Sequence, residues 1–186
     1  MAHVILGLLL IQPQSLYDIV KAFETAVSLF YSASSGSIRR ALETLLTREL
    51  IEVEQVEPGA RARKVYRVTD AGRQEFRDWM MGPVTGPDAE AAALPRLFFL
   101  GLLEPAERRD VLPRITARIE KDLAQLEALD ERLDTEEVPE GFDDVAAYQR
   151  ATLDYGIAGH RFALDWFREH AERRAAGLPQ GERLPR

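Results

Sequence analysis

Apolar residues recur along this chain with changing periods, and each period predicts an element. The segment His3 to Ile11 is apolar on nearly every side, which predicts a short buried helix that Pro13 ends. A second helix follows from Ser15, because Ser15 and Asp18 have the spacing of a capping box. Three- and four-residue steps give this helix an apolar stripe of Leu16, Ile19, Val20, Phe23 and Val27.

A third helix is predicted after the serine-rich segment 32–37. One face of this helix is apolar, formed by Ile38, Ala41, Leu42, Leu45 and Leu46. The other faces carry serine, threonine and arginine, which suits an element that lies in the DNA major groove.

Two short strands, 51–56 and 64–69, come next, with turn formers Pro58 and Gly59 between them. Arg61, Arg63 and Lys64 lie at or after the tip, so the pair predicts a β-hairpin with a basic end. Asp70 is expected to cap a fourth helix, 71–81, that buries Phe76, Trp79 and Met80. Three helices, a hairpin and a further helix form the layout of a winged helix-turn-helix.

The second half is dominated by two long helical patterns. A composition shift over 82–93 indicates a linker, and a dense apolar segment, 95–103, follows it. Apolar residues at three- and four-residue steps predict helices over 105–133 and 144–173, separated by a Pro/Gly/acid break. The last helix carries a coiled-coil-like seam of Val145, Tyr148, Thr152, Tyr155, Gly159, Phe162 and Trp166.

These two helices imply a second copy of the chain. A helix of about 30 residues is roughly 45 Å long, and two of them can pair but cannot enclose a core. A two-fold homodimer supplies the missing surface at the lowest cost.

Charge is distributed unevenly, and this changes how the net value of −7 is interpreted. Residues 1–82 contain 10 basic and 10 acidic residues, whereas residues 83–186 contain 14 and 21. The first half is therefore neutral overall with local basic clusters, and DNA responds to the local field.

The sequence gives little support for disulfides, a membrane span, a metal site or a catalytic site. The absence of cysteine excludes disulfides and thiolate sites and fits a cytoplasmic protein. The run Val4 to Ile11 is too short to cross a membrane. His3, His160 and His170 lack metal-ligand spacing, and no phosphate loop or nucleophile elbow is present. We expect no enzyme activity, no cofactor, no metal and no membrane partner.

The ordered residues resemble the PadR-like transcriptional regulators over nearly the whole chain. In the first half the likeness lies in Val4–Ile11 with Pro13, Tyr17–Ile19, Phe23–Glu24, Gly36–Ile38, Ala41–Leu42, Leu45, Leu50–Glu52, Arg63–Tyr66, Val68–Thr69, Ala71–Arg73 and Trp79. The second half is similar to the longer, virulence-regulator-like branch through Leu97–Phe99, Leu153–Gly156 and Trp166.

The resemblance implies dimeric, DNA-binding repressors whose last helices exchange across the dimer and some of which respond to small aromatic or drug-like ligands. Two positions depart from the family pattern. Arg39-Arg40 stand where Tyr-Pro is typical, and Leu16 stands where a glycine usually precedes the tyrosine. Arginine can hold phosphate or guanine, so we expect altered specificity with DNA binding retained.

We therefore expect a mainly α protein. Residues 1–82 form the winged helix-turn-helix with a two-stranded wing, 83–93 a linker, 94–175 a helical dimerisation and effector domain, and 176–186 a flexible tail. Its expected function is sequence-specific repression of transcription as a homodimer, relieved by a small aromatic effector. The alternative is a winged-helix protein–protein module that does not bind DNA.

Two groups of residues are candidates for function, and each has a plainer interpretation. The expected DNA contacts, which otherwise are solvated side chains, are Tyr17, Ser35, Ser37, Arg39, Arg40, Thr44, Arg61, Arg63 and Lys64. The seam residues either pack a dimer or line an effector pocket, and the sequence leaves both open for Tyr148, Tyr155, Gly159, Phe162 and Trp166.

Overall fold

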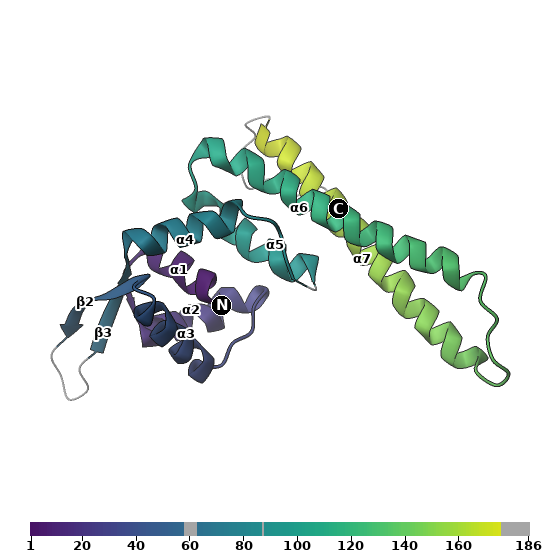
Figure 1. Cartoon of the computed structure of the whole chain (residues 1–186), viewed down its shortest axis with the longest axis horizontal. Coiled ribbons are helices and arrows are strands. Elements are labelled where there is room, and N and C mark those ends of the chain that lie inside the picture. Colours follow the sequence, from purple (N-terminus) through teal and green to yellow (C-terminus); the bar gives the residue numbers. More distant parts are fainter. Residues whose placement is uncertain (58–62, 87, 176–186) are drawn as a thin grey trace. The chain divides into compact units, whose positions relative to one another are not determined.

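The computed structural model describes residues 1–57, 63–86 and 88–175 (Figure 1). The chain divides into two compact units. The first holds residues 1–83 and 91–108, and the second holds residues 84–90 and those from Arg109 on. The division differs from the expected linker over 83–93, because helix α5 (Ala89–Phe98) begins inside it. Its alanine-rich start favours a helix over an extended connection.

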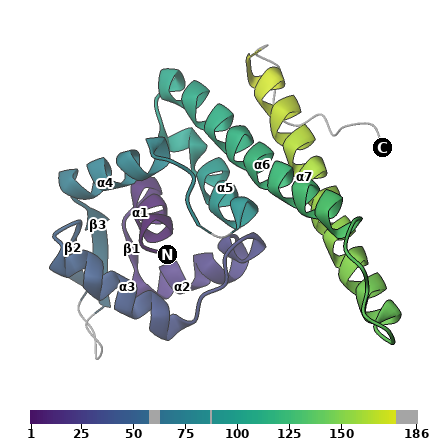
Figure 2. The same cartoon turned by 45° about the vertical axis from the view of Figure 1, so that its right-hand side comes forward.

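The first unit is built around α1 (Ala2–Ile11), whose side chains Ile5 and Leu6 are fully buried. Helices α2 (Leu16–Thr25), α3 (Ser35–Thr47) and α4 (Asp70–Met81) all contact α1 and surround it (Figure 2). A short 3-10 turn, Val27–Leu29, follows α2. These contacts explain the uniformly apolar sequence of α1, because a helix that packs against other elements all round has no side that favours polar residues.

Another contact joins α1 to the segment after α5. Phe99 lies beside a second 3-10 turn, Leu100–Leu102, and is almost completely buried. Its ring packs on Gly7, where a Cβ atom would come within 2.8 Å of the ring carbons. The absence of a side chain at Gly7 therefore permits this close approach.

The sheet of this unit has three strands in the order β1-β3-β2, all antiparallel. The predicted hairpin is present as β2 (Ile51–Glu57) and β3 (Arg63–Val68), with Ile51 opposite Val68. A short β1 (Gln14–Ser15), which the sequence patterns do not predict, lies on the other edge of β3. The buried Gln14 side chain donates a hydrogen bond to the Leu8 carbonyl and anchors β1 to α1.

Side-chain caps set the starts of the helices. The capping box of Ser15 and Asp18 at α2 is confirmed. At α4 the prediction was wrong by one residue, since Thr69 and not Asp70 is the N-cap. The Thr69 hydroxyl accepts a hydrogen bond from the Gly72 amide at 3.1 Å and donates one to the Glu49 carbonyl at 2.7 Å.

The second unit consists mainly of an antiparallel pair of long helices, α7 (Asp143–Ala175) and α6 (Pro105–Leu133) from Arg109 on (Figure 1). Ion pairs connect successive positions of the two helices in opposite order, namely Arg161 with Glu127 and Arg168 with Glu120. The packed faces bury a row of aliphatic and aromatic side chains: Ile115, Ile119, Leu153, Ile157, Leu164 and Phe167. Within the described ranges, every helix falls short of the length or the apolar character of a membrane span.

Candidate nucleic-acid interface

Helix α3 presents one polar face to solvent. Ile38, Leu42 and Leu45 are buried, whereas Arg39 and Arg40 are exposed. Neither arginine forms an ion pair with a residue in the described part of the chain. The helix therefore holds two guanidinium groups, each with its full set of donors available, on the side away from the core.

The hydroxyl groups of α3 differ in their availability. Ser37 lies in the first turn of α3, where its hydroxyl donates to the carbonyl of the N-cap residue Ser34 at 2.7 Å. Thr44 is exposed and donates to the Arg40 carbonyl at 2.9 Å, so its oxygen keeps acceptor capacity. Ser35 is exposed in the first turn of the helix. Of the three, Ser35 and Thr44 face outward and Ser37 serves the cap.

The base of the wing is tied to α2. Arg63, at the start of β3, forms an ion pair with Asp18 at 2.5 Å. Partial burial acts to raise the pKa of Asp18, but hydrogen bonds from Ser15 and the Arg63 guanidinium outweigh it and hold the pKa below its usual value. The carboxylate thus serves the capping box and the wing together. Arg63 was expected to contact DNA, and in this structure its guanidinium group binds the Asp18 carboxylate.

The remaining expected contacts lie on α2, on β3 or outside the described residues. Tyr17, in the first turn of α2, is 69% exposed. Lys64 on β3 is exposed and forms no ion pair with a residue that the structure describes. Arg61 lies outside the described residues.

Behind α3, a chain of contacts reaches across the unit. Arg48, at the end of α3, pairs with Glu75 of α4 at 3.1 Å, and His3 of α1 lies 3.5 Å from the same carboxylate. The His3 ring stacks on Trp79, and the Arg96 guanidinium lies 4.8 Å from the centre of the Trp79 ring. The buried Arg96 donates to the carbonyls of Ala92, Trp79 and Pro83. These contacts hold α3, α4 and α5 to one core, although only Trp79 stood out in the sequence.

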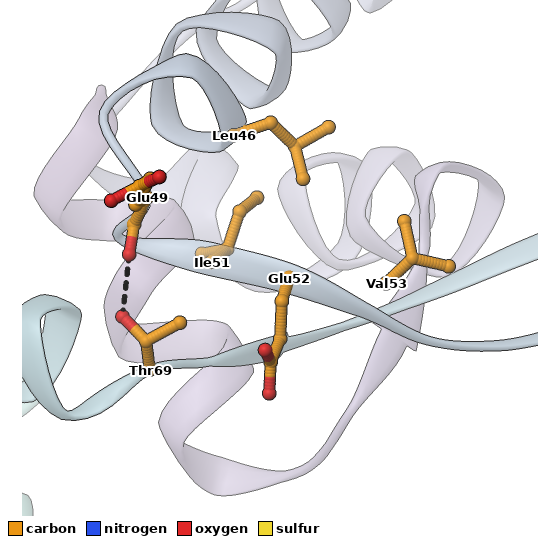
Figure 3. Close-up of a pocket in the computed structure, with 6 residues that line it drawn as sticks. All are labelled: Leu46, Glu49, Ile51, Glu52, Val53 and Thr69. Atoms are coloured by element: carbon orange, nitrogen blue, oxygen red, sulfur yellow. Dashed lines mark hydrogen bonds between the residues drawn. The ribbon is translucent and has the colours of Figure 1, made fainter.

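A hollow lies where α3 passes into β2 (Figure 3). Its lining residues are Leu46, Glu49, Ile51, Glu52, Val53 and Thr69. In Figure 3, Ile51 and Val53 lie on one side of β2 and Glu52 on the other. The acidic side chains of Glu49 and Glu52 make this hollow a poor site for phosphate, so it does not extend the basic surface.

The aromatic residues predicted as the seam of the last helix are exposed in the second unit. Tyr148, Tyr155 and Phe162 are 78%, 82% and 71% exposed, and Gly159 lies on the same face. Trp166 is half-buried and stacks on His170. Within the described part of the chain, no three acidic or histidine side chains are grouped to hold a metal ion.

A winged helix-turn-helix whose third helix exposes arginines without an acidic partner among the described residues defines a class of DNA-binding regulators. Comparison with known proteins identifies the family. The profile of the Transcriptional regulator PadR-like family matches residues 5–78, and the profile Virulence activator alpha C-term matches residues 92–173. The chain belongs to the PadR-like family of transcriptional regulators.

Its relatives span nearly the same length. A probable transcriptional regulator of Mycobacterium tuberculosis is 26% identical over 91% of this chain and 95% of its own. The negative transcriptional regulator PadR of Bacillus subtilis is 27% identical over 75% and 78%. Among solved structures, B. subtilis PadR with operator DNA aligns at 24% identity, 92% and 96% coverage and a TM-score of 0.42. The Vibrio cholerae virulence activator AphA aligns at 22% identity, 95% and 99% coverage and a TM-score of 0.41.

Proposed function

We propose that this regulator is a cytoplasmic homodimeric repressor that places α3 of each copy in the major groove of an operator, with the wing beside it. The observation that carries the proposal is the pair Arg39 and Arg40, exposed on α3 without a described acidic partner. Guanidinium groups in this position can bind guanine edges or phosphates. The negative regulator among its relatives supports repression.

Ser35, Thr44, Tyr17 and Lys64 supply the further contacts in this proposal, because all four side chains are accessible from solvent. Arg63 contributes indirectly, since its ion pair with Asp18 fixes the base of the wing against α2. Ser37 contributes through the cap of α3.

The dimer is supported by the exposed face of α7. A monomer that leaves Tyr148, Tyr155 and Phe162 in water exposes a large apolar patch, which is typical of an association surface. A second copy of the chain would cover it in both subunits at once.

The test begins with selection of bound sequences from random DNA, followed by binding measurements at several salt concentrations. Arg39→Ala with Arg40→Ala should weaken operator binding at least tenfold. The same change should reduce the log–log salt slope by about 0.9 for each phosphate that the protein no longer neutralises. The matched control is Arg109→Ala with Arg114→Ala, which removes the same charge from exposed positions of α6.

Equal losses of affinity in both double variants would mean that only net charge matters and would contradict the role of α3. If selection recovers no DNA and a protein partner is captured instead, the alternative of a protein–protein module stands. A reporter under the chain's own promoter tests repression, because loss of the regulator should raise expression.

Relief by a small aromatic effector is the remaining part of the proposal, and the family resemblance alone supports it. Thermal melts of the protein with a panel of aromatic acids should show a compound that raises the melting temperature and lowers operator affinity. A panel without any such compound would contradict this part and leave the DNA-binding proposal intact.

A further inference from the structure

One face of α7 carries no charge over its central turns. Between Val145 and Leu164 the charged residues of the helix are Arg150, Asp154 and Arg161, and they lie on other faces. Arg150 and Arg161 are paired with acidic residues of α6. The uncharged face alternates large side chains with small ones: Tyr148, Tyr155 and Phe162 with Ala151, Ala158 and Gly159.

Gly159 is not explained by packing against the described residues. A Cβ atom at this position would meet none of their atoms within 4 Å, and the backbone there is helical. Glycine inside a helix costs about 1 kcal/mol relative to alanine. The missing side chain therefore leaves room for something that approaches α7 from outside.

We infer that a second copy of α7 fills this space, running antiparallel with the two-fold axis on the exposed face at the level of residue 157, so that Tyr155 packs over the partner's Gly159. The inference rests on the proposed homodimer and specifies its geometry. It assigns the exposed aromatic face to the subunit interface and not to an effector pocket.

The arrangement follows from matching sizes. With the axis at the level of residue 157, each antiparallel layer joins residues at equal distances along the helix from that level. Tyr155 then meets the partner's Gly159, Thr152 meets the partner's Phe162, and Tyr148 meets the partner's Trp166. Large side chains face small ones in the middle, and aromatic rings meet at both ends, where their contact adds to the apolar burial.

Other alignments fill the space less well. A parallel pair would place Gly159 against its own copy and leave a void, which is costly in a packed interface. Moving the antiparallel axis half a heptad toward the N-terminus, which shifts the pairing by one heptad, leaves Trp166 without a seam partner. Moving it half a heptad the other way places Tyr148 against the partner's Arg173. The central register alone keeps every aromatic residue of the seam against another seam residue.

Cysteine cross-linking tests the register directly, because the natural chain has no cysteine. In Ala158→Cys the two thiols would lie beside the axis, and a disulfide requires Cα atoms within about 7 Å. In Thr152→Cys, the matched control on the same exposed face, the copies would lie about 15 Å apart along the helices. Under mild oxidation we expect the first variant to form a covalent dimer and the second to stay uncross-linked.

The outcomes separate this inference from the proposed function. Cross-linking of Thr152→Cys alone would establish a parallel pair and overturn the inference. Failure of both variants to cross-link, while light scattering shows a wild-type dimer, would overturn it and leave the homodimer intact. A wild-type monomer at micromolar concentration would contradict the homodimer itself.

A second variant measures the role of the gap. Gly159→Leu should raise the dimer dissociation constant at least tenfold, because the new side chain would occupy the space of the partner's Tyr155. Its helical circular dichroism should stay, since the position is open within the chain. An unchanged dissociation constant would overturn the inference.

Discussion

Thr69 joins three segments of the first unit through one hydroxyl group. It caps α4 at the Gly72 amide and donates to the carbonyl of Glu49, the residue between α3 and β2. Glu49 has a φ of 57°, a left-handed conformation that is unfavourable for a residue with a side chain. The hydroxyl therefore secures the turn that carries the chain from α3 into the wing.

Two substitutions of Thr69 distinguish the contribution of its hydroxyl group to stability from the contribution of its shape. Thr69→Val should lower the free energy of unfolding by about 1–2 kcal/mol, because it removes the N-cap and the hydrogen bond to Glu49 together. Thr69→Ser keeps the hydroxyl and should cost less than half as much. Chemical denaturation of both variants measures the difference, and equal losses would show that the methyl group matters more than the hydrogen bonds.

His3 makes the stability of the first unit depend on pH. Burial lowers the pKa of His3 below 6.5, and Arg96 and the N-terminus act in the same direction, against the opposing effect of Glu75. The unfolded chain therefore binds a proton at a higher pH than the folded chain does. Stability should fall as the pH drops below 6.5 toward the folded pKa.

His3→Phe, which keeps a ring against Trp79, should show a smaller loss of unfolding free energy between pH 7 and pH 5. Burial also lowers the pKa of His170, together with Arg174 and Arg173, so His170→Phe is the companion variant for the second unit. A wild-type profile that is flat over this interval would contradict the prediction for His3.

At the level of elements, the sequence predicted those helices and strands whose formation depends on residues close together in the chain. The capping box at Ser15 and the apolar stripe after it define α2, and alternation defines the hairpin. By contrast, β1 is two residues long and exists only because β3 pairs with it. No local pattern could indicate such a strand, since its partner lies about fifty residues further along the chain.

The candidate site shows the same division. Exposure of Arg39 and Arg40 follows from the apolar period of α3, so it could be predicted. The ion pair between Arg63 and Asp18 joins residues far apart in the sequence, and neither the capping box nor the basic tip indicates it. The start of α5 at Ala89 was missed because the flanking glycine and proline residues suggested a linker.

Packing of α4 against the turn between α3 and β2 leaves no room at Gly72. A Cβ atom there would lie 2.0 Å from the backbone oxygen of Leu50, which cannot move as a side chain would. Gly72→Ala should therefore cost about 3 kcal/mol of unfolding free energy. Gly101→Ala is the control, because its Cβ would meet no atom of the residues that the structure describes within 4 Å. Thermal melts that rank the two variants equally would contradict this account.

At the level of the whole molecule, DNA binding should depend on α7, although none of the proposed DNA contacts lies on that helix. A single winged helix reads one half-site, and two linked copies gain effective concentration at the second. Tyr148→Arg places a charge in the exposed aromatic face and should dissociate the dimer. We expect operator affinity at nanomolar protein to fall at least tenfold as a result.

Ala147→Arg is the matched control, since it adds the same charge to the neighbouring exposed residue on another face of α7. Light scattering and operator binding should both remain close to wild type for this variant. A Tyr148→Arg protein that is monomeric and still binds the full operator with unchanged affinity would contradict the coupling.

The uncharged face of α7 also determines how the two associations respond to their surroundings. Contacts between apolar surfaces gain from excluded salts, whereas contacts between arginine and phosphate are weakened by every added ion. A rise in ionic strength should therefore detach the protein from its operator as an intact pair of subunits. This surface has no charges that could repel the subunits of related regulators in the same cell. The choice of the correct partner subunit would therefore depend on how well the aromatic rings fit the spaces opposite them.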